Sequence, residues 1–458
     1  MKPLKIKEIA EAVGFSSENE SLIGRIETDS RTISEGSLFV ALRGETFDGH
    51  KYVESALEKG AAYALVDHGD ESDSRLIFCK DTEQGFLDIA GFYRDKFDVK
   101  IVGVTGSVGK TTTKEMIAAV LESKFATLKN EGNLNNRVGM PKTLFNLSDE
   151  HECAVIEMGM NQFGEISDLT RRAKPDVAVI TNIGVQHIEF LGSREGILKA
   201  KMEIREGMEE GSPLILCGDD DLLGSFEDKR FRIIRYGIDN KNCPITAESV
   251  EESVGETRFV LCANGKKMPA RIPTFGRHNV LNALAAYAVG KEFGMEDEEI
   301  ISALNNYVPS GMRQRLVEFK GMTVVEDCYN CGPDSLKAAI AAMASMPCDG
   351  KKIMVLGDML ELGDFANQLH AECGKCAAEK GIDLILSCGE LSEHTHKSFV
   401  ENAKSQQESR HFADREMMCE HLLSEIKNGA VKSGDILWFK ASHGVHLEEI
   451  IKRIYEEC

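Results

Sequence analysis

The stretch that decides the fold runs from Ile101 to Lys114 and reads IVGVTGSVGKTTTK. An apolar, β-branched run comes first, a glycine-punctuated turn follows, and the helical pattern MIAAVLESKF comes after it. This order predicts a strand, a phosphate-binding loop and a helix. In such a loop the backbone N–H groups of Gly106–Lys110 converge on phosphate oxygens, while the Lys110 ammonium adds positive charge and the Thr111 hydroxyl can contact Mg²⁺.

The loop departs from the strict P-loop pattern at one position. That pattern places a glycine five residues before Gly109, where this chain has Val104, and Gly103 is one residue out of register. A glycine-rich turn that binds nothing would explain the glycines. It would not explain Lys-Thr-Thr between a strand and a helix, so the stretch predicts a nucleoside triphosphate site.

Composition limits the classes of protein that this chain can belong to. At 458 residues it is long enough for about two to four domains. Lys and Arg number 54 against 75 Asp and Glu, a net charge of −21, which argues against nucleic acid or an anionic membrane as the main partner. The charged first residues do not resemble a signal peptide, and no stretch has the roughly eighteen consecutive apolar residues of a spanning helix.

Thirteen cysteines, an odd number scattered along the chain, indicate reduced thiols in the cytosol. Two C-x-x-C pairs occur, Cys328 with Cys331 and Cys373 with Cys376. The separation between the pairs is longer than zinc ribbons use, and the second pair lies in a helical pattern. Coincidental thiols are therefore the favoured interpretation.

The strand and helix patterns divide the chain into three α/β domains with mostly parallel sheets, at residues 1–98, 99–308 and 309–458. In the first, LFVAL (Leu38–Leu42) and AYALVD (Ala62–Asp67) predict buried strands, and HKYVESALEKG between them predicts a helix. In the second, strands and helices are expected to alternate. In the third, the apolar runs MTVVEDCYN, KKIMVLGDM, DLILSCGE and DILWFKAS predict a doubly wound sheet.

Two strand ends of the second domain carry candidate metal ligands. Glu157 ends the apolar run AVIE, and a carboxylate there can hold Mg²⁺. His187 follows the run DVAVITNIG, but a single histidine after a strand is more often structural. Beyond it, Ser193–Met208 predicts one helix, from which Lys199 and Lys201 project as ordinary solvated charges.

Two polar clusters leave alternatives open. Asn279 and Asn282 share one face at the start of a helix predicted over Phe275–Gly290, where one is expected to be a cap and both could touch a nucleotide. Thr28–Arg31 reads TDSR, whose arginine could contact phosphate. An ordinary Asp-Ser turn is the favoured interpretation of that cluster from the residues alone.

The motifs, taken in this order, resemble the Mur ligases of peptidoglycan synthesis, nearly from end to end. The pairing of Y-N-x-x-P-D-S with L-G-D-M-x-E-L-G resembles the member that adds a dipeptide rather than the member that adds the third residue. The motifs that carry the resemblance are TDSR (Thr28–Arg31), TGSVGKTTTK (Thr105–Lys114), EGNLNNRVGMP (Glu131–Pro141), IEMG (Ile156–Gly159), TNIGVQHIEFLGS (Thr181–Ser193), KAKMEI (Lys199–Ile204), GRHNVLNALAA (Gly276–Ala286), GMRQRL (Gly311–Leu316), DCYNCGPDSLKAAI (Asp327–Ile340) and VLGDMLELG (Val355–Gly363).

The resemblance implies an N-terminal UDP-binding domain, a central P-loop ATPase and a Rossmann-like C-terminal domain. It implies a cytoplasmic, monomeric ligase that uses ATP and Mg²⁺ to join D-alanyl-D-alanine to UDP-N-acetylmuramoyl-tripeptide through an acyl phosphate. The open alternatives are a sibling ligase that adds the third residue, a folylpolyglutamate synthase-like ligase, and a P-loop nucleotide switch.

The resemblance also implies roles for individual residues. The implied catalytic residues are Lys110, Glu157, His187 and Lys201. The implied metal ligands are Thr111, Glu157, His187 and Lys201, the last as a carbamate. The implied ATP contacts are Thr105, Gly106, Ser107, Val108, Gly109, Lys110, Thr111, Thr112, Asn279, Asn282, Arg313, Asp327, Tyr329 and Asn330. The implied contacts to the UDP substrate are Asp29, Ser30, Arg31, Thr46, Asn133, Asn135 and Asn136.

Two segments depart from the family pattern. Asn330-Cys331-Gly332-Pro333 stands where the family has N-A-N-P, and Phe439–His443 reads FKASH where the family has V-K-G-S-R. An arginine at the last position would give a bidentate carboxylate contact that His443 replaces only in part. These changes concern the dipeptide and domain-closure contacts rather than the ATP site.

Overall fold

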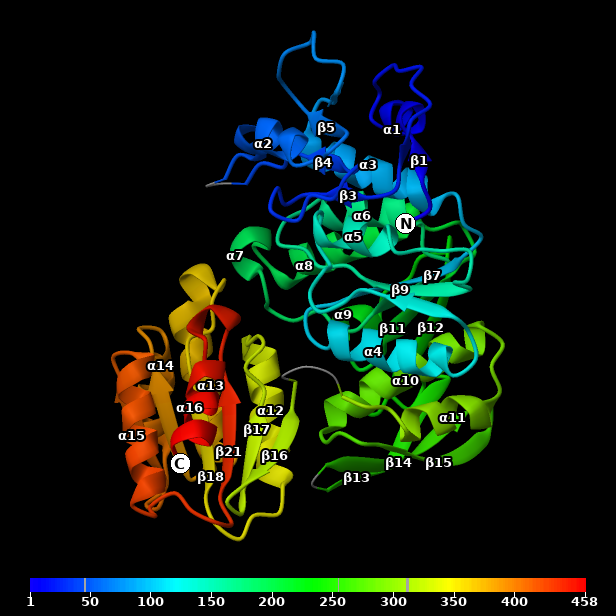
Figure 1. Cartoon of the computed structure of the whole chain (residues 1–458). Coiled ribbons are helices and arrows are strands. Elements are labelled where there is room, and N and C mark those ends of the chain that lie inside the picture. The colour runs from blue at the N-terminus through cyan, green and yellow to red at the C-terminus, as the bar shows by residue number, and fades with distance from the viewer. Residues whose placement is uncertain (45–46, 254, 310–312) are drawn as a thin grey trace. The chain divides into compact units, whose positions relative to one another are not determined.

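The computed structural model describes residues 1–44, 47–253, 255–309 and 313–458. Its strands form one four-stranded, one nine-stranded and one six-stranded sheet, besides the short pair β1 (Leu4–Lys5) and β2 (Leu22–Ile23). Helices alternate with these strands along most of the chain (Figure 1). The predicted α/β class is confirmed. In the described part of the chain, no helix combines the length and the apolar character needed to cross a membrane.

The chain divides into two compact units, each assembled from separate segments. The first comprises Met1–Thr105, Lys124–Ala178 and Met202–Ser212, and the second comprises Gly106–Ser123, Val179–Lys201 and Pro213–Cys458. The domain boundaries expected after residues 98 and 308 stay predictions.

The small sheet of the first unit has the strand order β3-β4-β5-β6, all parallel. The strand predictions for 38–42 and 62–67 are confirmed, and the predicted helix is a 3-10 turn, η1, that continues as α2. Buried alanines and Phe39 fill the space under α2. The elements are β3 (Ile26–Glu27), β4 (Leu38–Val40), η1 (Gly49–Tyr52), α2 (Val53–Glu58), β5 (Tyr63–Val66), β6 (Leu76–Phe78) and α3 (Thr82–Arg94), preceded by α1 (Ile6–Ala12).

The nine-stranded sheet has the order β15-β14-β13-β12-β11-β10-β7-β9-β8. The pairings β7-β9, β8-β9, β11-β12 and β12-β13 are parallel, whereas β13, β14 and β15 form an antiparallel meander. The strands are β7 (Lys100–Thr105), β8 (Thr127–Lys129), β9 (Cys153–Glu157), β10 (Val177–Ile180), β11 (Pro213–Cys217), β12 (Arg232–Gly237), β13 (Ile245–Ser253), β14 (Glu256–Ala263) and β15 (Lys266–Ile272).

The expectation of simple strand–helix alternation through this part is therefore wrong for residues 245–272. Asn264 and Gly265 both have positive φ, 50° and 76°, at the turn between β14 and β15. Asn-Gly between alternating runs is a strong hairpin signal that the sequence does contain.

The helices of this central part fall into both units. The helix predicted over 193–208 is broken: α8 ends at Lys201 and the chain continues as a 3-10 turn, η2. In the first unit the helices are α5 (Gly139–Leu144), α6 (Glu165–Ala173) and η2 (Met202–Gly207). In the second they are α4 (Lys110–Glu122), α7 (Ile188–Leu191), α8 (Arg194–Lys201), α9 (Asp221–Gly224), α10 (Arg277–Glu292) and α11 (Asp297–Asn305).

The six-stranded sheet, with order β16-β17-β21-β18-β19-β20, is parallel except for its edge strand β16. Its strands alternate their side chains between two cores, so that Trp438 joins the core under α12, α13 and α14 while Phe439 joins the core under α15 and α16. Figure 1 shows these helices around the strands. The predicted doubly wound sheet is confirmed.

The elements of this sheet and its helices are β16 (Arg315–Phe319), β17 (Met322–Glu326), α12 (Pro333–Ser345), β18 (Lys352–Leu356), η3 (Gly363–Phe365), α13 (Ala366–Glu379), β19 (Leu384–Cys388), α14 (Ser392–Asn402), β20 (Glu408–Phe412), α15 (Arg415–Lys427), β21 (Ile436–Lys440), η4 (His443–Val445) and α16 (Glu448–Glu457).

Candidate functional site

The strand, loop and helix predicted around Lys110 are present, since β7 ends at Thr105 and α4 begins at Lys110. Two glycines allow the loop its shape. Gly106 and Gly109 have φ of 149° and 84°, a region that side chains disfavour. A Cβ at Gly106 would lie 1.9 Å from Thr181 Oγ1. The loop therefore lies too close to its neighbours to accept any larger residue there.

The two residues that follow β10, Thr181 and Asn182, hydrogen-bond to the phosphate-binding loop. The Ser107 N–H donates to the Asn182 carbonyl at 3.0 Å, and the Val108 N–H donates to Asn182 Oδ1 at 2.9 Å. Thr181 Oγ1 donates to the Val108 carbonyl at 2.6 Å. Two of the amides expected to face phosphate therefore have protein partners, and the start of α4 supplies the outward-pointing N–H groups. Sequence reasoning missed Asn182, although it lies in the quoted TNIG motif.

Two lysines meet at one carbonyl of the loop. Lys110 Nζ donates to Gly106 O at 2.9 Å and to Ser107 O at 3.1 Å, and Lys201 Nζ donates to Gly106 O at 2.9 Å. Lys201 is 1% exposed, whereas Lys199 on the same helix is exposed. Burial, together with the charge of Lys110, lowers the pKa of Lys201 well below 10.5. The interpretation of Lys201 as a solvated charge is wrong.

His187 precedes α7 with φ of 64° and is largely buried. Its Nδ1 lies 3.0 Å from Glu361 Oε2 within the second unit. Burial lowers the pKa of His187, an effect that Glu361 partly offsets, and the close contact with His187 lowers the pKa of Glu361. Glu361 belongs to the quoted LGDMLELG motif, yet sequence reasoning gave it no role, because nothing local to either residue indicates the pairing.

In the first unit, Glu157 is the last residue of β9 and is buried. Asn135 Nδ2 donates to its carboxylate at 2.7 Å. Asn130 binds its backbone, accepting from the Glu157 N–H at 2.7 Å and donating to the Glu157 carbonyl at 3.2 Å. The carboxylate is therefore held in one orientation. Asn135, whose predicted contact with the substrate stays a prediction, contacts Glu157. Asn130 was missed.

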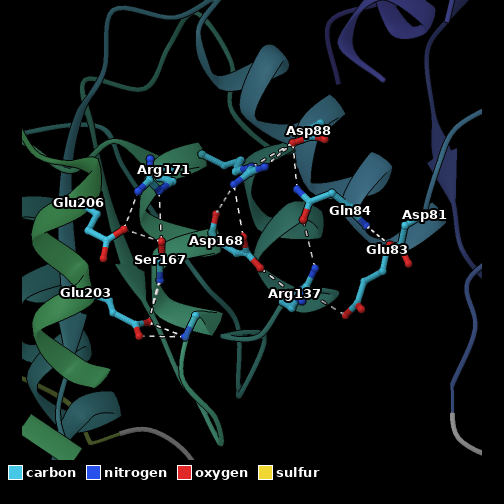
Figure 2. Close-up of polar contacts among 12 residues, drawn as sticks. Asp81, Glu83, Gln84, Asp88, Arg137, Ser167, Asp168, Arg171, Glu203 and Glu206 are labelled. Carbon is cyan, nitrogen blue, oxygen red and sulfur yellow. Dashed lines mark hydrogen bonds and ion pairs between the residues drawn. The ribbon is translucent and has the colours of Figure 1, made fainter. Parts of the chain in front are cut away.

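The rest of the loop before α5 has separate contacts. Asn133 is exposed, while Asn136 Oδ1 accepts the N–H that starts α5 at 2.8 Å. Figure 2 shows Arg137 between α3 and α6, where its guanidinium contacts Gln84 at 3.2 Å and Asp168 at 3.3 Å. The loop that carries the predicted substrate contacts is thus tied to two helices of the first unit.

The predicted UDP-contact residues before β4 form a compact turn. The Arg31 guanidinium lies against Asp29, with its Nη2 2.7 Å from a carboxylate oxygen, and these hydrogen bonds lower the pKa of Asp29 to about 2. The Ser30 carbonyl accepts from Lys59 Nζ at 3.0 Å. Arg31 is largely exposed. These contacts fit the turn interpretation and leave the guanidinium accessible to a ligand. Thr46 lies outside the described residues.

Asn279 and Asn282 are both buried and bind each other, Asn282 Nδ2 donating to Asn279 Oδ1 at 3.0 Å. Asn282 Oδ1 accepts from Thr113 Oγ1 at 3.0 Å, and Asn279 Nδ2 donates to Gln314 Oε1 at 2.8 Å. The residue that precedes the first turn of α10 is Gly276, which has no side-chain cap. The expected asparagine cap is wrong. The two side chains instead link α10 to α4.

At the end of β21, Lys440 is buried with its Nζ 2.8 Å from Asp327 Oδ2. Trp438 Nε1 donates to the same oxygen at 3.2 Å, and Lys440 Nζ lies 3.4 Å from the Asn330 carbonyl. Burial acts to lower the pKa of Lys440, but Asp327 outweighs it and the pKa is raised. The structure thus brings together Asp327, Asn330 and Lys440.

A stacked group lies beside this pair. The Arg313 guanidinium carbon lies 4.2 Å from the centre of the Tyr329 ring, and the His443 ring stacks on Tyr329 at 5.8 Å. His443, which stands where the family has arginine, therefore lies on an aromatic face beside a guanidinium. The imidazole of His443 can stack, but unlike a guanidinium it cannot donate two parallel hydrogen bonds to a carboxylate.

These features define a P-loop α/β protein that is built to hold nucleotide phosphate. Three family models match the chain: the Mur ligase family catalytic domain at residues 22–91, the Mur ligase middle domain at 104–290 and the Mur ligase glutamate ligase domain at 312–443.

Similar proteins extend over the whole chain. UDP-N-acetylmuramoyl-tripeptide–D-alanyl-D-alanine ligase of Bacillus subtilis (strain 168) is 39% identical over 459 residues, covering 98% of each chain. The crystal structure of MurF from Acinetobacter baumannii has a TM-score of 0.91 at 29% identity, covering 100% of both chains. MurF from Thermotoga maritima in complex with ADP has a TM-score of 0.84 at 28% identity, covering 94% of this chain and 97% of that one. The chain belongs to the Mur ligase family.

Proposed function

We propose that this chain is an ATP-dependent ligase that joins D-alanyl-D-alanine to UDP-N-acetylmuramoyl-tripeptide in peptidoglycan precursor synthesis. The observation that carries the proposal is the buried Lys201 against the phosphate-binding loop, since an amine with a lowered pKa in that place serves chemistry rather than solubility. Similarity to the named ligase over nearly the full length supplies the substrates.

The residues of the chain fit ATP and Mg²⁺. Gly106 and Gly109 leave a loop free of side chains where a phosphate must approach the backbone. The Thr111 hydroxyl and the oriented Glu157 carboxylate are oxygen donors of the kind that Mg²⁺ prefers. His187 would complete the ligand set together with a carbamate on Lys201. When bound, the metal would polarise phosphoryl oxygens and neutralise their charge.

Lys201 can become a carbamate only from its neutral amine. The lowered pKa meets this condition, because the free amine is the form that attacks CO₂. The attack forms an N–C bond and releases the amine proton, and the product is an anion with two oxygens. Such a group attracts a cation, whereas an ammonium beside Lys110 would repel it.

The reaction requires two anions to approach each other, the γ-phosphate of ATP and the terminal carboxylate of the tripeptide. Lys110 and the N-terminus of α4 are positioned to offset that charge, so that the carboxylate oxygen can attack phosphorus and release ADP. The dipeptide amine then attacks the acyl carbon of the acyl phosphate. Collapse of the tetrahedral intermediate releases inorganic phosphate, and the amine loses a proton as the amide forms.

Other parts of the chain take the remaining contacts in this proposal. Arg31, Ser30 and Thr46 with Asp29 would bind the uridine diphosphate, and Arg313, Tyr329, Asp327 and Asn330 would line the nucleotide with Asn279 and Asn282. The segments 1–98, 99–308 and 309–458 would act as the UDP-binding, ATPase and closing domains. We place the enzyme in the cytoplasm as a monomer, and the thirteen free thiols support a reducing compartment.

A substrate-omission assay tests the reaction. Release of inorganic phosphate is measured with ATP, UDP-N-acetylmuramoyl-tripeptide and D-alanyl-D-alanine, and with each omitted in turn. We expect release only with all three, because the acyl phosphate turns over only when the amine attacks it. Equal release without the dipeptide would contradict the proposal. Faster release with diaminopimelate, lysine or glutamate as the amine would assign a sibling ligase instead.

A matched pair of variants links the activity to the loop. Lys110→Ala should abolish phosphate release while retaining binding of the UDP substrate, and Lys229→Ala, at an exposed position, should retain both. Loss of both properties in Lys110→Ala would indicate that the loop has a structural role instead.

A further inference from the structure

A second cluster of metal-binding side chains lies in the first unit and includes none of the residues assigned above. It comprises His50 in η1 and the residues that follow β5, Asp67 and His68. Each offers one ligand atom, and these atoms all lie within 4.8 Å of one another. Two imidazoles and a carboxylate are the donors that zinc-class ions prefer, whereas Mg²⁺ prefers oxygen alone.

The spacing suits a small tetrahedral ion. His50 Nε2 lies 3.2 Å from Asp67 Oδ1, and His68 Nδ1 is in hydrogen-bond contact with the same oxygen. In a tetrahedral zinc site the ligand atoms stand about 3.3 Å apart, as follows from metal–ligand bonds of about 2.0–2.1 Å. The first pair already has this separation. The second pair needs only a small opening, by a shift of the His68 side chain, which is more than half exposed and whose ring stacks on His50 with 4.1 Å between the ring centres.

His50 is oriented for ligation by a carboxylate behind it. Its side chain is 7% exposed, and its Nδ1 lies 2.9 Å from Asp48 Oδ1. A carboxylate at one ring nitrogen holds the proton there and leaves the lone pair on the other. The Asp67 N–H points at Nε2 from 3.2 Å, which agrees with a lone pair at that atom.

The guanidinium of Arg43 already lies against the ligand atoms of Asp67 and His68. Arg43 Nη2 is 3.0 Å from Asp67 Oδ1 and 2.9 Å from His68 Nδ1. About half of the Arg43 side chain is exposed, so it can move out and leave the position to an ion.

A cavity of about 550 Å³ lies beside this cluster, since His50 and His68 both line it. Its acidic lining, Glu54, Glu58, Asp70 and Asp73, outnumbers the single basic Arg75 and attracts cations.

We propose that His50, Asp67 and His68 bind one divalent transition-metal ion of the zinc class, in competition with the guanidinium of Arg43. Asp48 is the outer carboxylate that orients His50, and water completes the coordination. This site is independent of the Mg²⁺ that the proposed ligase reaction uses.

Zinc binding to the full-length protein tests the proposal. Equilibrium dialysis against ZnCl₂ with saturating MgCl₂ measures zinc per chain, and the same titration is made with His68→Ala and Asp67→Asn. We expect the variants to lose one zinc per chain, or to bind it at least about tenfold more weakly, because one of three ligands is gone. His421→Ala is the matched control, since that histidine also contacts an arginine, Arg410, but belongs to no such cluster among the residues that the structure describes.

The second part of the test concerns the competition between zinc and the guanidinium of Arg43. Arg43→Met should tighten the same zinc, because the cation that occupies the position is removed, and His68→Ala in that background should abolish the gain. His68→Ala is expected to fold, since the side chain is mostly exposed. Equal zinc stoichiometry and affinity in the wild type and His68→Ala would overturn the proposal, and so would an Arg43→Met protein that binds zinc no more tightly than the wild type.

Discussion

Replacement of Lys201 by methionine should change the pH dependence of stability in a defined direction. The folded protein holds the pKa of this lysine well below 10.5, mainly by burial, whereas the unfolded chain restores the ordinary value. Between these two pKa values the unfolded chain binds a proton that the folded protein does not. The free energy of unfolding of the wild type therefore rises with pH through this window, and Lys201→Met lacks that contribution.

The magnitude follows from the proton count. One proton of difference corresponds to about 1.4 kcal/mol per pH unit. For each pH unit inside the window, the free energy of unfolding of the wild type should therefore rise by up to about 1.4 kcal/mol more than that of Lys201→Met. The lost hydrogen bond to Gly106 O costs about 1 kcal/mol or less, because Lys110 Nζ still donates to that oxygen at 2.9 Å. Methionine, of similar length and no charge, leaves no cavity.

Urea unfolding followed by far-ultraviolet circular dichroism, in CO₂-free buffer from pH 7.5 to 9.5, measures this difference. Lys199→Met is the control, because that side chain lies on the same helix but is exposed. The free energy of unfolding of Lys199→Met should change with pH in the same way as that of the wild type across the range. If Lys201→Met were also parallel to the wild type, the lysine would not lose its proton on folding in this range, and the condition for a carbamate would be absent.

Three further variants test other contacts. Asn135→Ala should raise the Mg²⁺ concentration for half-maximal phosphate release about tenfold, because Glu157 loses its 2.7 Å donor; an unchanged requirement would separate that carboxylate from the metal. Gly109→Ala should weaken ADP binding in calorimetry and destabilise the fold by about 1–3 kcal/mol, since φ is 84° and the new Cβ meets a buried asparagine oxygen. Lys440→Met should lower the free energy of urea unfolding by about 3–5 kcal/mol by leaving Asp327 buried without its ammonium, and adding Asp327→Asn should restore most of it.

The sequence predicts local structure well where one element carries its own pattern. The strand, loop and helix around Lys110 are an example, because their glycines and periodicity are all within one short stretch. The break at Lys201 between α8 and η2 was not predicted, since the helical pattern continues through it. The meander of β13–β15 was missed although Asn264-Gly265 signals it, because alternation of strands and helices was extended too far.

The candidate site was predictable as a set of residue types but not as a set of contacts. Glu157 could be chosen because it ends an apolar strand, yet Asn130 and Asn135, which orient it, come from a different segment. The same holds for Asn182 at the phosphate-binding loop and for Glu361 beside His187. Each pairing joins positions far apart in the chain, and a short polar residue in a loop carries no sign of its distant partner.

Lys201 shows how energetics can separate the two interpretations that the sequence left open. A solvated lysine costs nothing, whereas a buried amine is desolvated at a cost that a single hydrogen bond does not recover. Gly106 O already has the ammonium of Lys110 as a donor, so the fold does not need a second one. Methionine or leucine would fill the same space at a lower free energy. A residue that lowers stability at a phosphate-binding loop is explained by what its neutral amine can do.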